Sequence, residues 1–286
     1  MTQRFLTALI MLVALTACAG GPGPVSVQPG AENLTPVQLD SLWRSADTAF
    51  KSGKWDDALQ RYQRFLLEAP PGDPRVVEAH MMMGESHFAK KNRLDAAREF
   101  RRVSDETPTH PLAPGALLRV GDAYAALWRR PELDPSYGQS ALATYQELLS
   151  RYPDSEAART AQAKIAELNN WFAAKALKAA RYYLRLKAYD SAIIYLRDLL
   201  ATYPRADVAP EALGNLIRAY RTLGYVEDVR ETCEYLRRFH PDAPEGEKSC
   251  AEVPAAGGVA PVRADSIPPL APPADSTPRA APPAGS

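Results

Sequence analysis

The chain has 286 residues and carries 34 basic and 34 acidic side chains, so its formal net charge is zero. Nucleic-acid-binding domains usually have a basic excess, and this balance therefore argues against a nucleic-acid partner. The composition is ordinary for a soluble domain, except that proline makes up 26 of the residues. Since proline is rare inside helices and strands, its positions should mark the boundaries of structural units.

The N-terminus has the pattern of a lipoprotein export signal. Arg4 precedes an uncharged apolar run, residues 5–17, that is too short to span a bilayer permanently. The run ends in Leu-Thr-Ala followed by Cys18, which is typical of a bacterial lipobox. We therefore expect residues 1–17 to be a signal peptide and Cys18 to carry the lipid anchor; the alternative is an ordinary signal peptide with an incidental cysteine.

A Gly/Pro-rich stretch follows this cysteine, and we expect residues 18–34 to be a flexible tether. Ala19, rather than aspartate, comes directly after Cys18. By resemblance to lipoprotein sorting in diderm bacteria, this favours the outer membrane, with the protein on the periplasmic face.

A fixed spacing recurs through residues 35–250. Five times, a residue suited to helix packing stands twelve positions before a proline: Ala58, Ala96, Ala141, Ala192 and Val229 precede Pro70, Pro108, Pro153, Pro204 and Pro241. Twelve positions further upstream, four of these residues have a small or apolar partner, namely Ala46, Gly84, Ala180 and Ile217. In the third segment the partner is Gly121, twenty positions upstream, which implies an eight-residue insertion around residues 129–139.

This pattern resembles the tetratricopeptide repeat (TPR), in which small residues let two antiparallel helices approach and a proline follows the second helix. Gly53, Asn92 and Gly224 fall at the turns inside the pairs, where a left-handed residue is needed. Residues 155–186 lack glycine and proline, which predicts one long helix capped by Asp154 or Ser155. With no alternating strand pattern, the prediction is an all-α solenoid of about five helix pairs.

Residues 251–286 contain nine prolines and ten alanines, with few large apolar side chains. We expect this C-terminal tail to be disordered and partly of polyproline type. A function for it as a tether to the cell wall is an open alternative.

Several segments of the repeat region resemble the BamD family of outer membrane lipoproteins. They are residues 134–135, 141–149 and 151–155, together with the Thr-Pro-Thr-His-Pro run at 107–111. The resemblance covers residues 35–241 and implies a scaffold of the β-barrel assembly machinery (the BAM complex). Such a scaffold would bind a BamA-like β-barrel protein and other lipoproteins of the machinery, and would receive unfolded outer membrane proteins for membrane insertion.

One stripe of each first helix should line the concave groove of such a solenoid. In the N-terminal half this stripe is rich in aromatic and methionine side chains, which is typical of surfaces that accept varied apolar peptides. The predicted substrate-peptide groove comprises Trp43, Arg44, Phe50, Lys51, Met81, Met82, Phe88 and Arg119. Arg44, Lys51 or Arg119 would bind a peptide carboxylate. The alternative is that Trp43, Phe50 and Phe88 only pack against neighbouring helices.

In the C-terminal half the same stripe is basic. It contains Lys178, Arg181, Arg185, Arg218 and Arg221, which we predict to meet an acidic face of a partner protein. The alternatives are a solvated helix face or internal ion pairs with residues such as Asp190 or Glu211.

Two cysteines remain after Cys18. Cys233 and Cys250 could form a disulfide in the oxidising periplasm, or stay as inert thiols.

The sequence does not indicate an enzyme. It contains no His-Glu-x-x-His motif of metal-dependent hydrolases, no Gly-x-Ser-x-Gly motif of serine hydrolases and no Gly-rich phosphate-binding loop. His80 and His87 fall on a packing stripe, and His110 and His240 fall in turns between repeats. We therefore predict a protein that is not an enzyme and needs no cofactor or metal. The rival functions are a TPR lipoprotein of cell-division, pilus or polysaccharide machinery, or a cell-wall tether.

Overall fold

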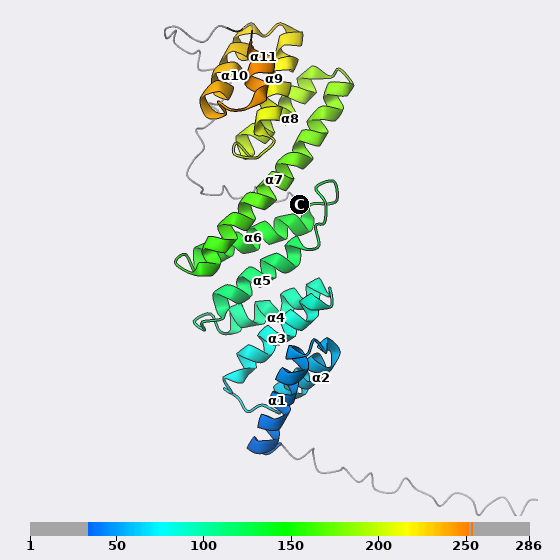
Figure 1. Cartoon of the computed structure of the whole chain (residues 1–286), viewed down its shortest axis with the longest axis vertical. Coiled ribbons are helices and arrows are strands. Elements are labelled where there is room, and N and C mark those ends of the chain that lie inside the picture. The colour runs from blue at the N-terminus through cyan, green and yellow to red at the C-terminus, as the bar shows by residue number, and fades with distance from the viewer. Residues whose placement is uncertain (1–33, 252, 254–286) are drawn as a thin grey trace, which may run out of the picture.

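The computed structural model describes residues 34–251 and 253, and these form a stack of helix pairs without any strand (Figure 1). The helices are α1 (Pro36–Lys51), α2 (Trp55–Glu68), α3 (Arg75–Ala89), α4 (Arg93–Glu106), α5 (Ala113–Ala125), α6 (Ser136–Arg151), α7 (Glu156–Arg185), α8 (Tyr189–Thr202), α9 (Ala209–Leu223), α10 (Val226–Phe239) and α11 (Pro244–Cys250). Each helix from α1 to α10 packs against the next one in the chain, so the five predicted helix pairs are confirmed.

Local signals set the helix boundaries. Thr35 caps α1 through a reciprocal capping box with Gln38, and Pro36 begins the helix at the position where its missing N–H costs nothing. The side chain of Ser155 accepts a hydrogen bond from the Ala158 amide and so caps α7. The prolines at the predicted twelve-residue spacing all stand two residues beyond the last residue of the second helix of a pair.

Small residues bring the helices of the first four pairs together, as predicted. Ala46 and Ala180 are fully buried. Gly84 faces the Phe100 ring so closely that a Cβ atom at this position would lie 2.5 Å from it, and at Gly121 a Cβ would lie 2.2 Å from the Tyr145 ring. Since such contacts are not sterically possible, each glycine is required for the aromatic ring of the second helix to pack.

The turns inside the pairs correct one prediction. Gly53 and Gly224 have φ values of 69° and 77° and take the left-handed conformation, as expected. In the second pair, however, Lys91 has the positive φ of 66°, whereas Asn92 has a φ of −80° and stands at the start of α4. The prediction for Asn92 was therefore wrong by one residue, because the left-handed residue of this turn is the one before the N-cap, and Asn92 is itself the N-cap of α4.

The predicted long helix is α7, whose 30 residues join two parts of the stack (Figure 1). Its N-terminal half packs on α5 and α6 in a core with Trp128, Tyr145 and Leu148. Its C-terminal half belongs to a separate core with α8, α9 and α10, which contains Ala180 and Leu196.

A short helix that the sequence did not predict, α11, closes the C-terminal end of the stack. It packs against α9 and α10. In the structure Cys233 of α10 and Cys250 of α11 form a disulfide with a Cα–Cα distance of 5.7 Å. Arg237 also donates hydrogen bonds of 2.7 Å to the carbonyl oxygens of Cys250 and Val253.

Four predictions fall outside the described residues: the signal peptide, lipidation of Cys18, all but the last residue of the tether, and nearly all of the tail. Within the part of the chain that the structure describes, no helix is long and apolar enough to cross a membrane.

Candidate binding pocket

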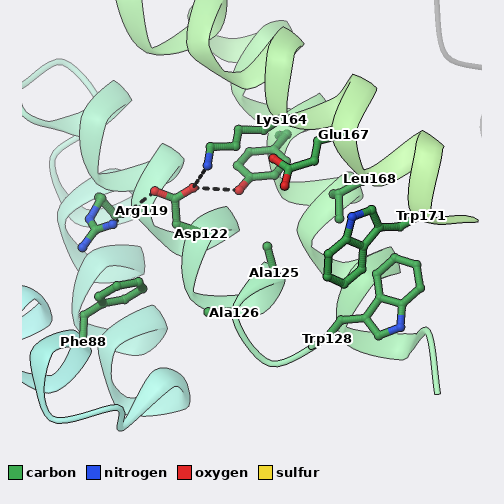
Figure 2. A pocket seen from close by; sticks show the side chains of 11 residues that line it. Phe88, Arg119, Asp122, Ala125, Ala126, Trp128, Lys164, Glu167, Leu168 and Trp171 are labelled. Atoms are coloured by element: carbon green, nitrogen blue, oxygen red, sulfur yellow. Dashed lines mark hydrogen bonds and ion pairs between the residues drawn. The ribbon is translucent and has the colours of Figure 1, made fainter. Parts of the chain in front are cut away.

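A pocket of about 350 Å³ opens where the first helices of three successive pairs meet (Figure 2). Its lining comes from α3, α5, α6 and α7 and from the loop between α5 and α6. The residues are Phe88, Arg119, Asp122, Ala125, Ala126, Trp128, Tyr145, Lys164, Glu167, Leu168 and Trp171. This volume is at the lower end of the range for small-ligand sites, and it suits one or two peptide side chains.

Asp122 lies at the centre of the polar side of the pocket (Figure 2). Its carboxylate accepts a 2.8 Å hydrogen bond from the Tyr145 hydroxyl and a 3.1 Å bond from Arg119, and Lys164 Nζ lies 4.0 Å away. Burial, together with the nearby charge of Asp122, raises the pKa of Tyr145, so the phenol stays protonated and remains a donor. Asp122 therefore ties α5, α6 and α7 together at the pocket.

Arg119 is held on several sides. It makes a bidentate pair with Glu85 at 2.6 and 2.7 Å, and its guanidinium carbon lies 4.1 Å from the centre of the Phe88 ring. Burial alone would lower its pKa, but the bonds to Glu85 and Asp122 outweigh burial and raise it. Because two carboxylates already neutralise Arg119, it has little charge left for a ligand.

Lys164 is the more available cation. Its side chain is 42% exposed and its only described ion-pair partner is Asp122, at the 4.0 Å limit of such a contact. Lys164 can therefore turn toward an incoming carboxylate at small cost in lost interactions.

Aromatic rings form the apolar wall. Trp128 is 2% exposed, and its ring centre lies 5.5 Å from that of Trp171 and 4.5 Å from that of Phe172. Trp128 stands three residues beyond the end of α5, and its ring lies against Gly138, where a Cβ atom would approach to 2.1 Å. The predicted insertion therefore builds this wall, since it forms the loop between α5 and α6 that returns the chain to Gly138.

The structure brings together only two of the eight residues predicted for the peptide groove, Phe88 and Arg119. Trp43 packs on Tyr62 and Phe65 with ring distances of 5.4 and 5.0 Å, and Phe50 packs on Trp55 at 5.5 Å. These contacts match the alternative that Trp43 and Phe50 support neighbouring elements.

The other four residues of the predicted groove also lie outside the pocket. Arg44 is exposed and donates to the carbonyl of Asp40, while Lys51 pairs with Asp47 one turn earlier. Met81 and Met82 are half-buried against two different core clusters.

The five predicted partner-binding residues are all exposed but are not equally free. Arg181 pairs with Glu211 of α9, as one alternative expected, and Arg221 donates 2.8 Å to the Ser249 carbonyl of α11. Lys178 lies 3.8 Å from Glu132, Arg218 bonds Asn215, and Arg185 lies 5.9 Å from the Tyr182 ring.

The histidines of α3 are structural, as predicted. His80 Nδ1 lies 2.8 Å from Glu99 Oε2 in a pair that is almost fully buried. His87 is half-buried, and burial lowers its pKa. Among the described residues, no group of three potential ligands is arranged to hold a metal ion.

Sequence reasoning missed Trp128, Lys164 and Trp171. The register of α7 was counted from Ala180, so its N-terminal half was not assigned to the groove. Lys164, Leu168 and Trp171 recur at intervals of four and three residues, which places them on one helix face and is the signal that identifies them.

Comparison with known proteins points to one family. The model of the YfiO family, described as an outer membrane lipoprotein, matches residues 36–236. The outer membrane protein assembly factor BamD of Vibrio cholerae is 26% identical over 247 residues, which cover 83% of this chain and 98% of that protein. BamD of Xylella fastidiosa strain 9a5c is 26% identical over 255 residues, or 85% of either chain.

Solved structures with a similar course of helices include the TPR domain of P58(IPK), with a TM-score of 0.40 and 14% identity over 75% of this chain and 55% of that one. A TPR protein of Thermus thermophilus has a TM-score of 0.33 and 20% identity over 74% of this chain and 97% of its own.

Proposed function

Because the chain belongs to the YfiO family of outer membrane lipoproteins, we propose that it is a non-catalytic scaffold that binds unfolded β-barrel proteins and the BamA-like protein that inserts them. In this proposal Cys18 carries the lipid anchor and residues 18–34 hold the TPR domain, residues 35–250, on the periplasmic side of the outer membrane. The observation that supports substrate binding best is the pocket of Figure 2, which combines an aromatic wall with an available lysine.

The pocket suits the end of a peptide that has an aromatic last residue. An aromatic side chain can lie against Trp171 and Phe88, where it gains both apolar burial and ring contacts. The terminal carboxylate would then pair with Lys164, whereas Arg119 would hold the Phe88 ring in place. This assignment replaces Arg44 and Lys51 as carboxylate partners, since neither lines the pocket.

Partner binding would use the C-terminal half of the stack. Lys178, Arg185 and Arg218 are exposed there, and they fit an acidic face on the BamA-like protein. Arg181 and Arg221 hold α9 and α11 in place, and their contribution to a partner surface is correspondingly smaller.

Peptide binding tests the pocket directly. A fluorescent decapeptide that ends in phenylalanine with a free carboxylate should bind more tightly than the same peptide with a C-terminal amide, by about tenfold for one charge-assisted contact. Fluorescence anisotropy with the purified chain measures both affinities. Lys164→Gln should abolish the difference, whereas Lys178→Gln on the same helix should preserve it. Equal binding of acid and amide by the unmodified chain would contradict this use of the pocket.

A further inference from the structure

The fourth helix pair, α7 with α8, has a face that the preceding pair leaves uncovered. In the second, third and fifth pairs, the residue two positions after the packing residue of the first helix is fully buried: these residues are Ser86, Ala123 and Ala219. In each of these pairs the first helix also packs against the second helix of the preceding pair. In the fourth pair the equivalent residue is Tyr182, and it is 51% exposed.

The second helices show the same difference. Three positions after the packing residue of the second helix, the second, third and fifth pairs hold Glu99, Thr144 and Thr232, which are at most 5% exposed. The equivalent residue of α8 is Tyr195, which is 40% exposed. Among the described pairs, only the first resembles the fourth in this respect. Its residues at the same two positions are the exposed Thr48 and the half-buried Arg61, because no described pair precedes it.

The length of α7 explains the gap. Because α6 packs against the N-terminal half of α7, the C-terminal half extends beyond α6 and starts a new stack with α8 and α9 (Figure 1). The fourth pair therefore has the open leading face of a first repeat.

The chemistry of this face differs from that of a terminal cap. End faces of repeat proteins are normally polar, and the first pair follows this rule with Thr48 and Arg61. The face of the fourth pair is instead aromatic and aliphatic, and we call it the tyrosine face. It consists of Tyr182, Tyr183, Leu186, Ile194 and Tyr195.

These rings form one continuous surface. Tyr183 stacks on Tyr195 at 4.9 Å and meets Tyr182 edge-on at 5.5 Å. Leu186 and Ile194 are 59% and 68% exposed, so the surface is apolar as well as accessible. A contiguous apolar patch of this kind marks an interaction site.

Side-chain size decides what kind of segment can cover the tyrosine face. Where a helix covers the equivalent first-helix position, the residue is serine or alanine, which lets the backbones approach to the usual 8–10 Å. Tyr182 and Tyr195 fill that space. The occupant should therefore be an extended segment that stacks on the rings.

We propose that the tyrosine face binds the chain's own proline-rich segment, residues 261–283. This segment contains eight prolines, four of them in the run Pro-Pro-Leu-Ala-Pro-Pro at 268–273. Proline-rich segments with polyproline II geometry bind surfaces lined by aromatic rings, and they lose little conformational entropy because proline already restricts the chain.

The tail begins close enough to reach this face. Val253, the last described residue, packs against the core cluster of α7 to α11, which also contains Ala180 of α7 and Ile193 of α8. The fifteen residues from Val253 to Pro268 span about 45 Å when extended, whereas α8 with its 14 residues is about 21 Å long. Because the tail is attached to the chain, its effective concentration is in the millimolar range, and weak contacts are sufficient.

Site-specific photo-crosslinking of the purified full chain in detergent tests the proposal. A benzophenone amino acid replaces Tyr195, and in a matched control it replaces Thr48, which lies on the equivalent open face of the first pair. Mass spectrometry then locates the adducts. We expect adducts with residues 261–283 at position 195 to exceed those at position 48 by about tenfold, in line with millimolar tethering.

A second variant separates specific binding from chance collisions of the tail. Replacing the four prolines of residues 268–273 with serine keeps the tail length but removes the polyproline preference, and it should reduce the tail adducts at position 195 to the level at position 48. The proposal is overturned if the adduct yield is unaffected by these serines. It is equally overturned if position 195 reacts instead with a second copy of the chain or with a co-purified protein. Circular dichroism confirms that each variant is folded.

Discussion

Gly138 shows how one missing methyl group shapes the binding pocket. A Cβ atom there would lie 2.1 Å from the Trp128 ring, which is buried and cannot move aside without disturbing Trp171 and Phe172. Gly138→Ala should therefore lower the free energy of unfolding by about 1–3 kcal/mol and weaken peptide binding. Urea denaturation measures the first effect. Gly115→Ala in α5, where nothing lies within 4 Å of the new Cβ, is the control and should be neutral or slightly stabilising.

The buried pair of His80 and Glu99 predicts a pH dependence of stability. Burial tends to raise the pKa of Glu99, but the hydrogen bond and charge of His80, with Arg102 and Arg98, outweigh it and hold the pKa below its ordinary value of 4.5. The folded state thus binds the Glu99 proton more weakly than the unfolded state does. The stabilisation is complete well above pH 4.5 and is lost as the pH falls through the folded pKa.

Urea denaturation between pH 7 and pH 3 tests this assignment. Glu99→Gln should reduce stability at pH 7, and the difference from the unmodified chain should shrink toward pH 3, where Glu99 is itself protonated. A difference that stays constant with pH would show that the carboxylate charge of Glu99 contributes nothing.

Individual pocket residues were only partly predictable. Phe88 and Arg119 were identified because the repeat register places them on the inner stripe of α3 and α5. Trp128 was not, because its position depends on the loop formed by the insertion and on its contact with Gly138. Trp43 and Phe50 have the right stripe position but pack inside the first pair and its turn, since a register does not reveal which neighbour covers a ring.

Among the elements, α11 depends most on a covalent bond. It has only seven residues, so its intrinsic helical stability is negligible, and it is held by the disulfide and by Arg221 and Arg237. Removing the link with Cys233→Ser and Cys250→Ser should lower the free energy of unfolding by about 3 kcal/mol, as for loops of similar length.

Hydrogen exchange gives the local counterpart of this prediction. Amides of residues 245–250 should lose protection in the double-serine variant, while those of α3 and α5 should keep it. Reductant should have the same effect on the unmodified chain and none on the variant. Unchanged protection of α11 after loss of the disulfide would contradict its dependence on this link.

The ten longer helices were predictable, whereas α11 was not. Recurrent small residues and prolines fixed the pairs, and the absence of glycine and proline from residues 155–186 predicted α7 as a single helix. By contrast, α11 contains Pro244 and Gly246 and lacks a helical apolar period, and it owes its position to tertiary contacts. Local pattern therefore predicts repeating elements well and an element held by a disulfide poorly.

At the scale of the whole molecule, the two halves of α7 contribute residues to two different surfaces of the stack. Its N-terminal half supplies Lys164 and Trp171 to the pocket, whereas its C-terminal half carries Lys178, Arg185 and the tyrosine face. In the function proposed above, this single helix would hold the substrate site and the partner surface at a fixed separation. A scaffold that passes an unfolded protein to an insertion machine would need such an arrangement.

The central claim is membership of the β-barrel assembly machinery, and affinity capture from detergent-solubilised membranes tests it most directly. The chain is tagged after Ser286 and expressed at its natural level, and co-purifying proteins are identified by mass spectrometry against an untagged strain. We predict recovery of a BamA-like β-barrel protein in near-stoichiometric amount. Recovery of cell-division, pilus or polysaccharide components without any such barrel protein would contradict the account.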